Sequence, residues 1–354
     1  MSISSLSFRR AAVFLFIGSC APAASATAGM VERFDAEIAR LSATNEPPTA
    51  ALRDEASIAP EFTVERRLNI SLDFPLGVQG AMYAGSFHGN AAVFTRAGGY
   101  LDATVVRGSD TAVTSFDTAT GATPEGTQRS QFATAVDDPR RRVRRSVGPG
   151  HVEDPNAYSL HVHFFRHDDL IDHTARDLHA RYAAWWLADM ALRVLPAERM
   201  RVSYWERVPW LTSMAYGDTE SLFDFDHALN LVSDDYGFGM DKTYKNKFIL
   251  LTASAPMPGT AGVAFQGGNE AMASIAGRDR VVAHEIGHML GATHEDAEMR
   301  GWWGCDTNMV AVATQGRRDC RDYSAANRRA MRSYMRHGPD TVAPRRMADA
   351  PASR

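Results

Sequence analysis

The chain has 354 residues, of which 45% are hydrophobic and 23% are charged. These proportions are typical of soluble globular proteins and are sufficient for one large domain or two domains of ordinary size. The formal net charge of −4 gives no reason to expect a nucleic acid or an anionic membrane as a partner.

Residues 1–28 have the features of a signal peptide. A positively charged start precedes the apolar stretch AAVFLFIGS, and small residues suited to cleavage follow at 24–28. The apolar stretch is about half as long as a membrane-spanning helix. We therefore expect a secreted or periplasmic protein without a membrane span, and a lipid anchor at Cys20 is the weaker alternative.

The remaining two cysteines, Cys305 and Cys320, lie close together in the sequence. An oxidising compartment would allow them to form a disulfide bond. The alternative is a pair of buried free thiols, and the expected export favours the disulfide.

The N-terminal part of the mature chain is predicted to be rich in β-strands. Residues 30–43 have helical spacing, whereas residues 61–115 consist of β-branched and aromatic runs broken by glycine, as in an antiparallel sheet. We expect residues 29–138 to form a small β-rich prodomain. The basic segment at 139–150 is then a linker and a candidate processing site, although such arginine runs are usually no more than solvated segments.

Strands and helices alternate in residues 151–340. We predict strands at 158–167, 200–208, 245–254, 262–267 and 269–275, and helices at 172–195, 221–237, from about 281 to 291, and 324–337. This order predicts an α/β fold with a largely parallel sheet between helices, and Ser324 is placed to cap the last helix. Residues 341–354 are expected to be a disordered tail.

The stretch VVAHEIGHMLGATHE, residues 281–295, carries the strongest functional signal. Positions four apart lie on one face of a helix, so His284 and His288 can bind one metal ion. Glu285 lies about 100° around the helix from His284, within reach of a water on that metal.

Gly291 is placed to end this helix, because glycine readily adopts a positive φ. The resulting turn would bring His294 back as a third ligand, whereas a continuing helix would place it roughly 9 Å from His288 along the axis. Three imidazoles leave one position of a zinc ion open for water, as in catalytic sites. An ordinary histidine-rich helix, or a structural site with Cys305 as fourth ligand, are the less favoured alternatives.

The segment HEIGHMLGATH resembles, residue for residue, the zinc signature of the metzincin metallopeptidases. The resemblance implies an α+β domain with a mostly parallel twisted sheet, an antiparallel edge strand, an active-site helix and a C-terminal helix. It also implies one catalytic zinc, Glu285 as general base, and Met309 in a methionine turn beneath the metal. Residues 82–106 resemble propeptides of the reprolysin (adamalysin) type.

Two features depart from particular metzincin subfamilies. Glu295 follows the third histidine, as in astacins, where reprolysins usually have aspartate, and no tyrosine lies two residues after Met309. The expected prodomain contains no cysteine, so it cannot inhibit through a thiolate on zinc. Inhibition by the prodomain would have to be steric or use Asp, Glu or His.

These observations predict an exported zinc metalloendopeptidase. Its protein or peptide substrate is expected to lie extended along the edge strand near residues 261–267, and Trp302, Trp303 and Val310 are candidates for a specificity pocket. The alternatives are a zinc amidohydrolase acting on cell-wall peptides and a non-catalytic zinc-containing binding protein. Glu285 argues against the second, because a binding protein has no need of a base beside the open metal position.

Two other groups of polar residues are weaker candidates. His161 and His163 lie on one face of a predicted strand and could bind a second metal, but histidines in this setting are usually surface or core residues. Five aspartates could hold calcium but lack the spacing of a calcium loop, so calcium is unsupported. They are Asp224, Asp226, Asp234, Asp235 and Asp241.

Overall fold

The computed structural model describes residues 29–44, 61–107, 110–118, 121–123, 159–236, 243–301, 304–312, 316–339 and 347–351. The expected signal peptide and the basic linker at 139–150 lie outside the described residues. Trp302, Trp303 and Asp241 lie outside them as well.

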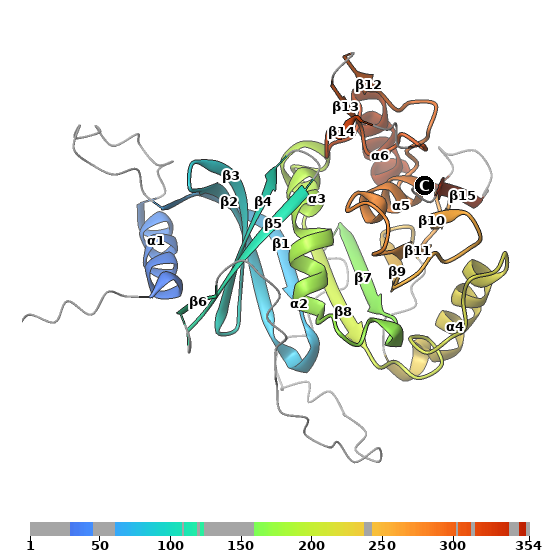
Figure 1. The fold of residues 1–354 in the computed structure, drawn as a ribbon, viewed down its shortest axis with the longest axis horizontal. Coiled ribbons are helices and arrows are strands. Elements are labelled where there is room, and N and C mark those ends of the chain that lie inside the picture. Colours follow the sequence, from blue (N-terminus) through green and yellow to red (C-terminus); the bar gives the residue numbers. More distant parts are fainter. Residues whose placement is uncertain are drawn as a thin grey trace, which may run out of the picture.

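A twelve-stranded sheet runs through the described part of the chain, in the order β15-β10-β11-β9-β7-β8-β1-β2-β3-β4-β5-β6 (Figure 1). Its strands are β1 Phe62–Asp73, β2 Gln79–Phe87, β3 Asn90–Ala97, β4 Tyr100–Arg107, β5 Asp110–Asp117, β6 Gly121–Thr123, β7 Leu160–Arg166, β8 Met200–Glu206, β9 Asn246–Thr252, β10 Thr260–Phe265, β11 Glu270–Ser274 and β15 Met347–Pro351. A small second sheet contains β12 Met299–Arg300, β13 Cys305–Asp306 and β14 Arg318–Asp319.

The helices connect and cover these strands. They are α1 Met30–Thr44, α2 Ala175–Leu178, α3 Ala184–Asp189, α4 Ser221–Tyr236, α5 Val281–Met289 and α6 Ala325–His337. The π-helical segment His179–Ala183 joins α2 to α3, and a second π-helical segment, Met190–Val194, continues α3 at its C-terminal end. None of the helices in the described ranges combines the length and the hydrophobicity needed to cross a membrane.

The C-terminal half contains the predicted mostly parallel sheet. Strands β8, β7, β9 and β11 pair in parallel, and β10 pairs antiparallel with β11 near the edge. The α/β fold with an antiparallel strand at this edge is therefore confirmed. The predicted helix at 324–337 is confirmed as α6, and the Ser324 side chain caps it by accepting a hydrogen bond from the Asn327 N–H.

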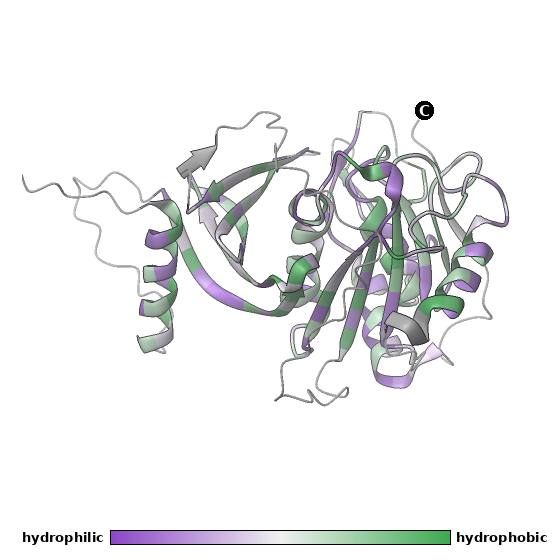
Figure 2. Cartoon of the chain, turned by 90° about the horizontal axis from the view of Figure 1, so that it is seen from below, coloured by the Kyte–Doolittle hydropathy of each residue, from purple (hydrophilic) through white to green (hydrophobic). Residues whose placement is uncertain are grey.

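Helices cover both faces of this half, because its strands are hydrophobic on both sides. Neighbouring residues of β7 show the two layers: Phe164 packs against Trp186 of α3, whereas Phe165 packs against Phe225 of α4. Helices α5 and α6 contribute to the same core cluster as α3. Figure 2 shows hydrophobic strands in the interior and helices with one hydrophobic and one hydrophilic side.

The predicted antiparallel β region at 61–115 is confirmed as β1 to β5. Its strands continue the C-terminal sheet, because residues 70–73 of β1 pair in parallel with residues 200–203 of β8. Buried polar contacts also join the two halves: the Arg176 guanidinium contacts the Asp102 carboxylate, and His179 hydrogen-bonds Thr95.

The N-terminal strands lie far from β10 in the sheet, the strand along which a substrate is expected to bind. Four strands, β11, β9, β7 and β8, lie between β10 and β1 in the sheet. At about 4.8 Å between neighbouring strands, β1 lies roughly 24 Å from β10. The N-terminal strands thus extend the sheet at the end opposite to β10, as Figure 1 shows.

The C-terminal tail differs from its prediction. We predict disorder for residues 341–354, whereas Met347–Pro351 form β15 and pair with β10. An edge strand presents a row of unpaired backbone N–H and C=O groups, which favours pairing with any extended segment that can reach it.

Candidate metal centre

Helix α5 carries the histidine motif in the interior of the protein. All nine of its residues are buried, and the helix lies beside β10 and β11 (Figure 1). A helix buried on every side positions its polar residues precisely, because the surrounding side chains restrict their rotamers. His284, Glu285 and His288 are therefore held in a dense core rather than on a surface.

The end of α5 turns the chain back towards the helix. Gly291 has a φ of 86°, its N–H donates to the His288 carbonyl at 3.0 Å, and the Ala292 N–H donates to the Gly287 carbonyl at 2.8 Å. This pair of bonds is a Schellman motif with glycine in the left-handed position. The turn brings His294 to the side of the helix on which the other two histidines lie.

The three histidines converge through their Nε2 atoms. The Nε2 of His284 lies 3.1 Å from that of His288, and each lies 3.0 Å from the Nε2 of His294. In the described ranges of the chain, no other set of three His, Cys, Asp or Glu residues offers ligand atoms this close together. The structure thus brings together the three predicted metal ligands.

Hydrogen bonds at Nδ1 fix the tautomers of two of these rings. The Nδ1 of His284 lies 2.7 Å from the Asn308 carbonyl oxygen. That of His288 lies 2.9 Å from the Gln266 Oε1 and 3.2 Å from the Ala292 carbonyl oxygen. Since all three oxygens accept hydrogen bonds, Nδ1 carries the hydrogen in both rings, and each neutral ring presents a lone pair at Nε2.

Burial keeps these rings neutral. It lowers the pKa of His288 to about 3, with a smaller contribution from His294. Burial also lowers the pKa of His284 well below its usual range, with His288 and His294 adding to the effect. Lone pairs that face each other at 3.1 Å repel, so the arrangement is suited to a cation.

The donor set and its spacing fit zinc. Zinc binds imidazole nitrogens at about 2.0–2.1 Å, so tetrahedral ligands lie about 3.3 Å apart, close to the observed 3.0–3.1 Å between Nε2 atoms. The carbonyl and amide acceptors at Nδ1 are also typical of zinc-bound histidines, since they orient the ring and raise its basicity.

The side chain of Glu285 extends from α5 towards β10, and the residue is fully buried. A Cβ atom at Gly262 of β10 would come within 2.5 Å of the Glu285 Oε1, so glycine at this position leaves room for the carboxylate. No pattern in the sequence indicated that Gly262, Gln266 and the carbonyl of Asn308 would contact the histidine motif. The motif itself does not indicate which residues from distant parts of the sequence will contact it.

Met309 lies beneath the helix in a tight turn. It is fully buried, and the Val310 N–H donates to the Thr307 carbonyl at 3.1 Å across the turn. The Arg280 guanidinium donates to the carbonyls of Thr307 and Val310, which ties the turn to the start of α5. A disulfide bond joins Cys305 of β13 to Cys320, which directly follows β14.

Gly287 allows Met309 to approach α5 closely. A Cβ atom at Gly287 would lie 2.2 Å from the Met309 Sδ. We expect Gly287→Ala to lower the free energy of unfolding by about 1–3 kcal/mol, because the core would have to shift to accept the methyl group. Urea unfolding should show the loss. The control is Gly99→Ala, where the nearest atom is the Thr118 hydroxyl at 3.1 Å. An equal effect of both variants would contradict the close packing at Met309.

Among the side chains that the structure describes, the other predicted groups do not form a comparable centre. The rings of His161 and His163 are tilted against each other with their centroids 3.8 Å apart, but they hydrogen-bond Ser203 and Trp205 respectively. Asp224 and Asp226 lie on α4. The side chains of Asp234 and Asp235 are outside the described part of the structure.

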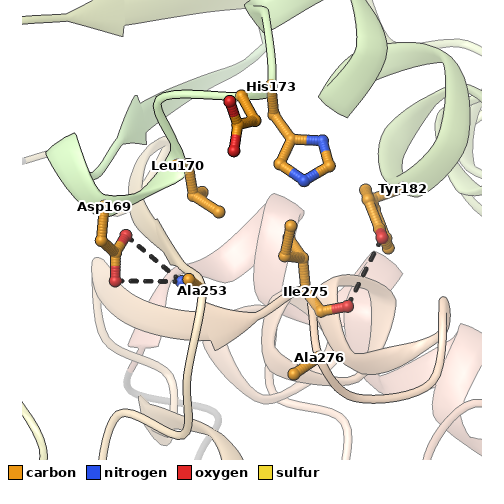
Figure 3. A pocket seen from close by; sticks show the side chains of 8 residues that line it. Asp169, Leu170, His173, Tyr182, Ala253, Ile275 and Ala276 are labelled. Atoms are coloured by element: carbon orange, nitrogen blue, oxygen red, sulfur yellow. Dashed lines mark hydrogen bonds between the residues drawn. The ribbon is translucent and has the colours of Figure 1, made fainter. Parts of the chain in front are cut away.

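A cavity of about 340 Å³ opens at the carboxyl ends of β7, β9 and β11 (Figure 3). It is lined by Asp169, Leu170, Asp172, His173, Tyr182, Ala253, Ile275 and Ala276. Two of its polar side chains are already engaged: Asp169 accepts from the Ala253 N–H, and the Tyr182 hydroxyl donates to the Ile275 carbonyl. None of its lining residues belongs to the histidine centre.

Comparisons with known proteins found matches among solved structures. No protein-family model matches the chain, and no curated protein matches it. Among solved structures, metalloproteinase-II from Bacteroides fragilis is similar, with 14% identity and a TM-score of 0.47. The match covers 75% of this chain and 85% of that one. At this level of similarity, the function has to be argued from the site itself.

Proposed function

We propose that the chain is an exported zinc-dependent metalloendopeptidase that hydrolyses peptide bonds in proteins or peptides. The observation that carries the proposal is the convergence of three imidazole Nε2 atoms within 3.1 Å, with the buried Glu285 on the same helix. Three neutral ligands and an adjacent carboxylate are the arrangement of a catalytic rather than a structural zinc site.

The proposed reaction assigns a role to each residue. His284, His288 and His294 would hold one zinc ion, which supplies a Lewis acid and an activated water when bound. Glu285 takes a proton from the attacking water and passes it to the leaving amine nitrogen. An extended peptide that paired with the edge of β10 now taken by β15 would be aligned beside Glu285 by main-chain hydrogen bonds.

We also propose that the chain belongs to the metzincin clan. The complete zinc motif, the turn at Gly291 and the buried Met309 beneath the helix support this assignment. The narrower reprolysin-like assignment depends on the resemblance of residues 82–106, and Glu295 argues against it.

Export and processing are part of the proposal. Residues 1–28 would be the signal peptide, 29–138 the prodomain and 151–340 the catalytic domain, and the Cys305–Cys320 disulfide is compatible with an oxidising compartment. Strand β1 pairs with β8, at the end of the parallel strands opposite to β10, and the Arg321 guanidinium donates to the Thr111 hydroxyl of β5, so the N-terminal strands contact the catalytic half at both places. We therefore propose that they stabilise the catalytic half by extending its sheet.

Metal removal tests the proposed function. We expect the purified protein to cleave casein or gelatin, to lose this activity after dialysis against a strong zinc chelator, and to regain it with about one equivalent of zinc per chain. Calcium added instead of zinc should not restore activity, because calcium prefers oxygen ligands. Activity that persists without zinc would exclude the proposal, and cleavage of cell-wall peptides but not of proteins would favour an amidohydrolase.

A further inference from the structure

The C-terminal strand β15 occupies the outer edge of β10. Its residues pair antiparallel with that strand: Gly262 pairs with Ala350, Val263 with Asp349, Ala264 with Ala348, and Phe265 with Met347. The other edge of β10 pairs with β11. Both edges of β10 are thus used within the described part of the chain, and an incoming peptide would find its edge already filled.

The register places β15 beside the candidate base. Gly262 adjoins the Glu285 carboxylate, and Ala350 is its partner in β15. The tail therefore passes the same point of β10 at which a substrate would have to lie for its scissile bond to meet Glu285. Figure 1 shows β15, β10 and α5 side by side at this end of the sheet.

We propose that residues 347–351 are an internal competitor that occupies the peptide-binding edge of β10 and is displaced by substrate. The consequence for catalysis rests on the proposed peptidase function. The occupancy of β10 does not, and it can be measured in a protein without activity.

The composition of the segment indicates a competitor that substrates can displace. Its sequence, MADAP, consists mostly of small residues, and Pro351 lacks the N–H needed to continue the pairing. Helix α6 ends at His337, so a short stretch of chain tethers the strand close to β10. Tethering of this kind gives an effective concentration in the millimolar range, which favours occupancy without making it irreversible.

The expected effect is a change in apparent affinity for substrate. Removal of the residues after Asp340 should lower the KM for an extended peptide by about tenfold, with a smaller change in kcat, because the tail competes only with binding. The free peptide MADAPASR should inhibit the truncated protein competitively. These changes distinguish a competitor from a segment that merely stabilises the fold.

Two full-length variants test the strand itself. The double substitution Ala348→Pro and Asp349→Pro removes two adjacent backbone N–H groups, so it disrupts the pairing whichever of the two faces β10. The matched control, Ala352→Pro with Ser353→Pro, introduces the same number of prolines beyond the end of β15. The first variant should behave like the truncated protein, and the control like the wild type.

Amide hydrogen exchange over Thr260–Phe265 measures occupancy without reference to activity. We expect exchange in β10 to become at least about tenfold faster in the truncated and double-proline proteins, and to stay unchanged in the control. Tryptic nicking within residues 139–150 should leave it unchanged as well, since β1 to β6 lie at the far end of the sheet.

The outcomes separate the two proposals. Equal exchange in full-length and truncated proteins would overturn the inference, whether or not the protein cleaves peptides. Faster exchange with an unchanged KM in an active protein would also overturn it, because the tail would then not compete with substrate. If no zinc-loaded variant cleaves any substrate, the peptidase proposal fails, and the exchange result still decides whether the tail occupies β10.

Discussion

Replacing Glu285 with glutamine is expected to lower kcat/KM for peptide hydrolysis by about 10²–10⁴-fold, the usual contribution of a general base. Glutamine has nearly the same shape, so it should fit the space beside Gly262. It cannot accept a proton from water, and this is the function that the variant removes. The zinc content should remain at about one per chain, since the three imidazole ligands are unchanged.

Initial rates on a quenched peptide, with zinc measured on the same sample, provide this test. The control is Glu220→Gln, which changes an exposed glutamate just before α4 and should leave both quantities unaltered. If the Glu285 variant kept its activity, another group would have to act as base. If it lost zinc together with activity, Glu285 would have a role in metal binding that the geometry of the three histidines does not suggest.

Replacing His288 with alanine is expected to remove zinc and activity together. The ring supplies one of three converging Nε2 atoms and is nearly fully buried. A side chain at the protein surface therefore cannot reach this position and replace the lost ligand. Changes to residues that merely orient a metal ligand cost about 10–100-fold in affinity, and the loss of a ligand should cost more. Competition with a zinc-binding dye would measure this loss.

A histidine outside the centre provides the control for this variant. His161→Ala alters a ring that contacts His163 and hydrogen-bonds Ser203, and the zinc content should not change. Circular dichroism should show that both variants fold, because an unfolded His288 variant would lose zinc for a trivial reason. Wild-type zinc affinity in a folded His288→Ala protein would contradict the assignment of this ligand.

Much of the candidate centre could be predicted because its geometry is local. His284, His288 and Glu285 share one helix, and a single glycine, Gly291, sets the turn that returns His294. Helical spacing and the conformational freedom of glycine are properties of a short segment, so the sequence specifies them without reference to the rest of the fold. The same reasoning located α6, whose start is fixed by the cap at Ser324.

The hydrogen-bond acceptors around the candidate metal ligands could be identified only from the tertiary structure. The carbonyl oxygen of Asn308 and the side chain of Gln266 meet the histidine rings from other segments, and Gly262 makes room for Glu285. A backbone carbonyl has no residue-specific signature, so no pattern in the sequence marks it as a hydrogen-bond partner.

The sequence by itself thus determined the histidine motif of the candidate metal centre, the alternation of strands and helices, and the antiparallel strands of the N-terminal half. Only the tertiary structure decided that β1 joins β8, so that both halves share one sheet, and that β15 pairs with β10. The physical reason is the same for both pairings. Strands pair through backbone hydrogen bonds common to all residues except proline, and the partner can lie more than a hundred residues away along the chain.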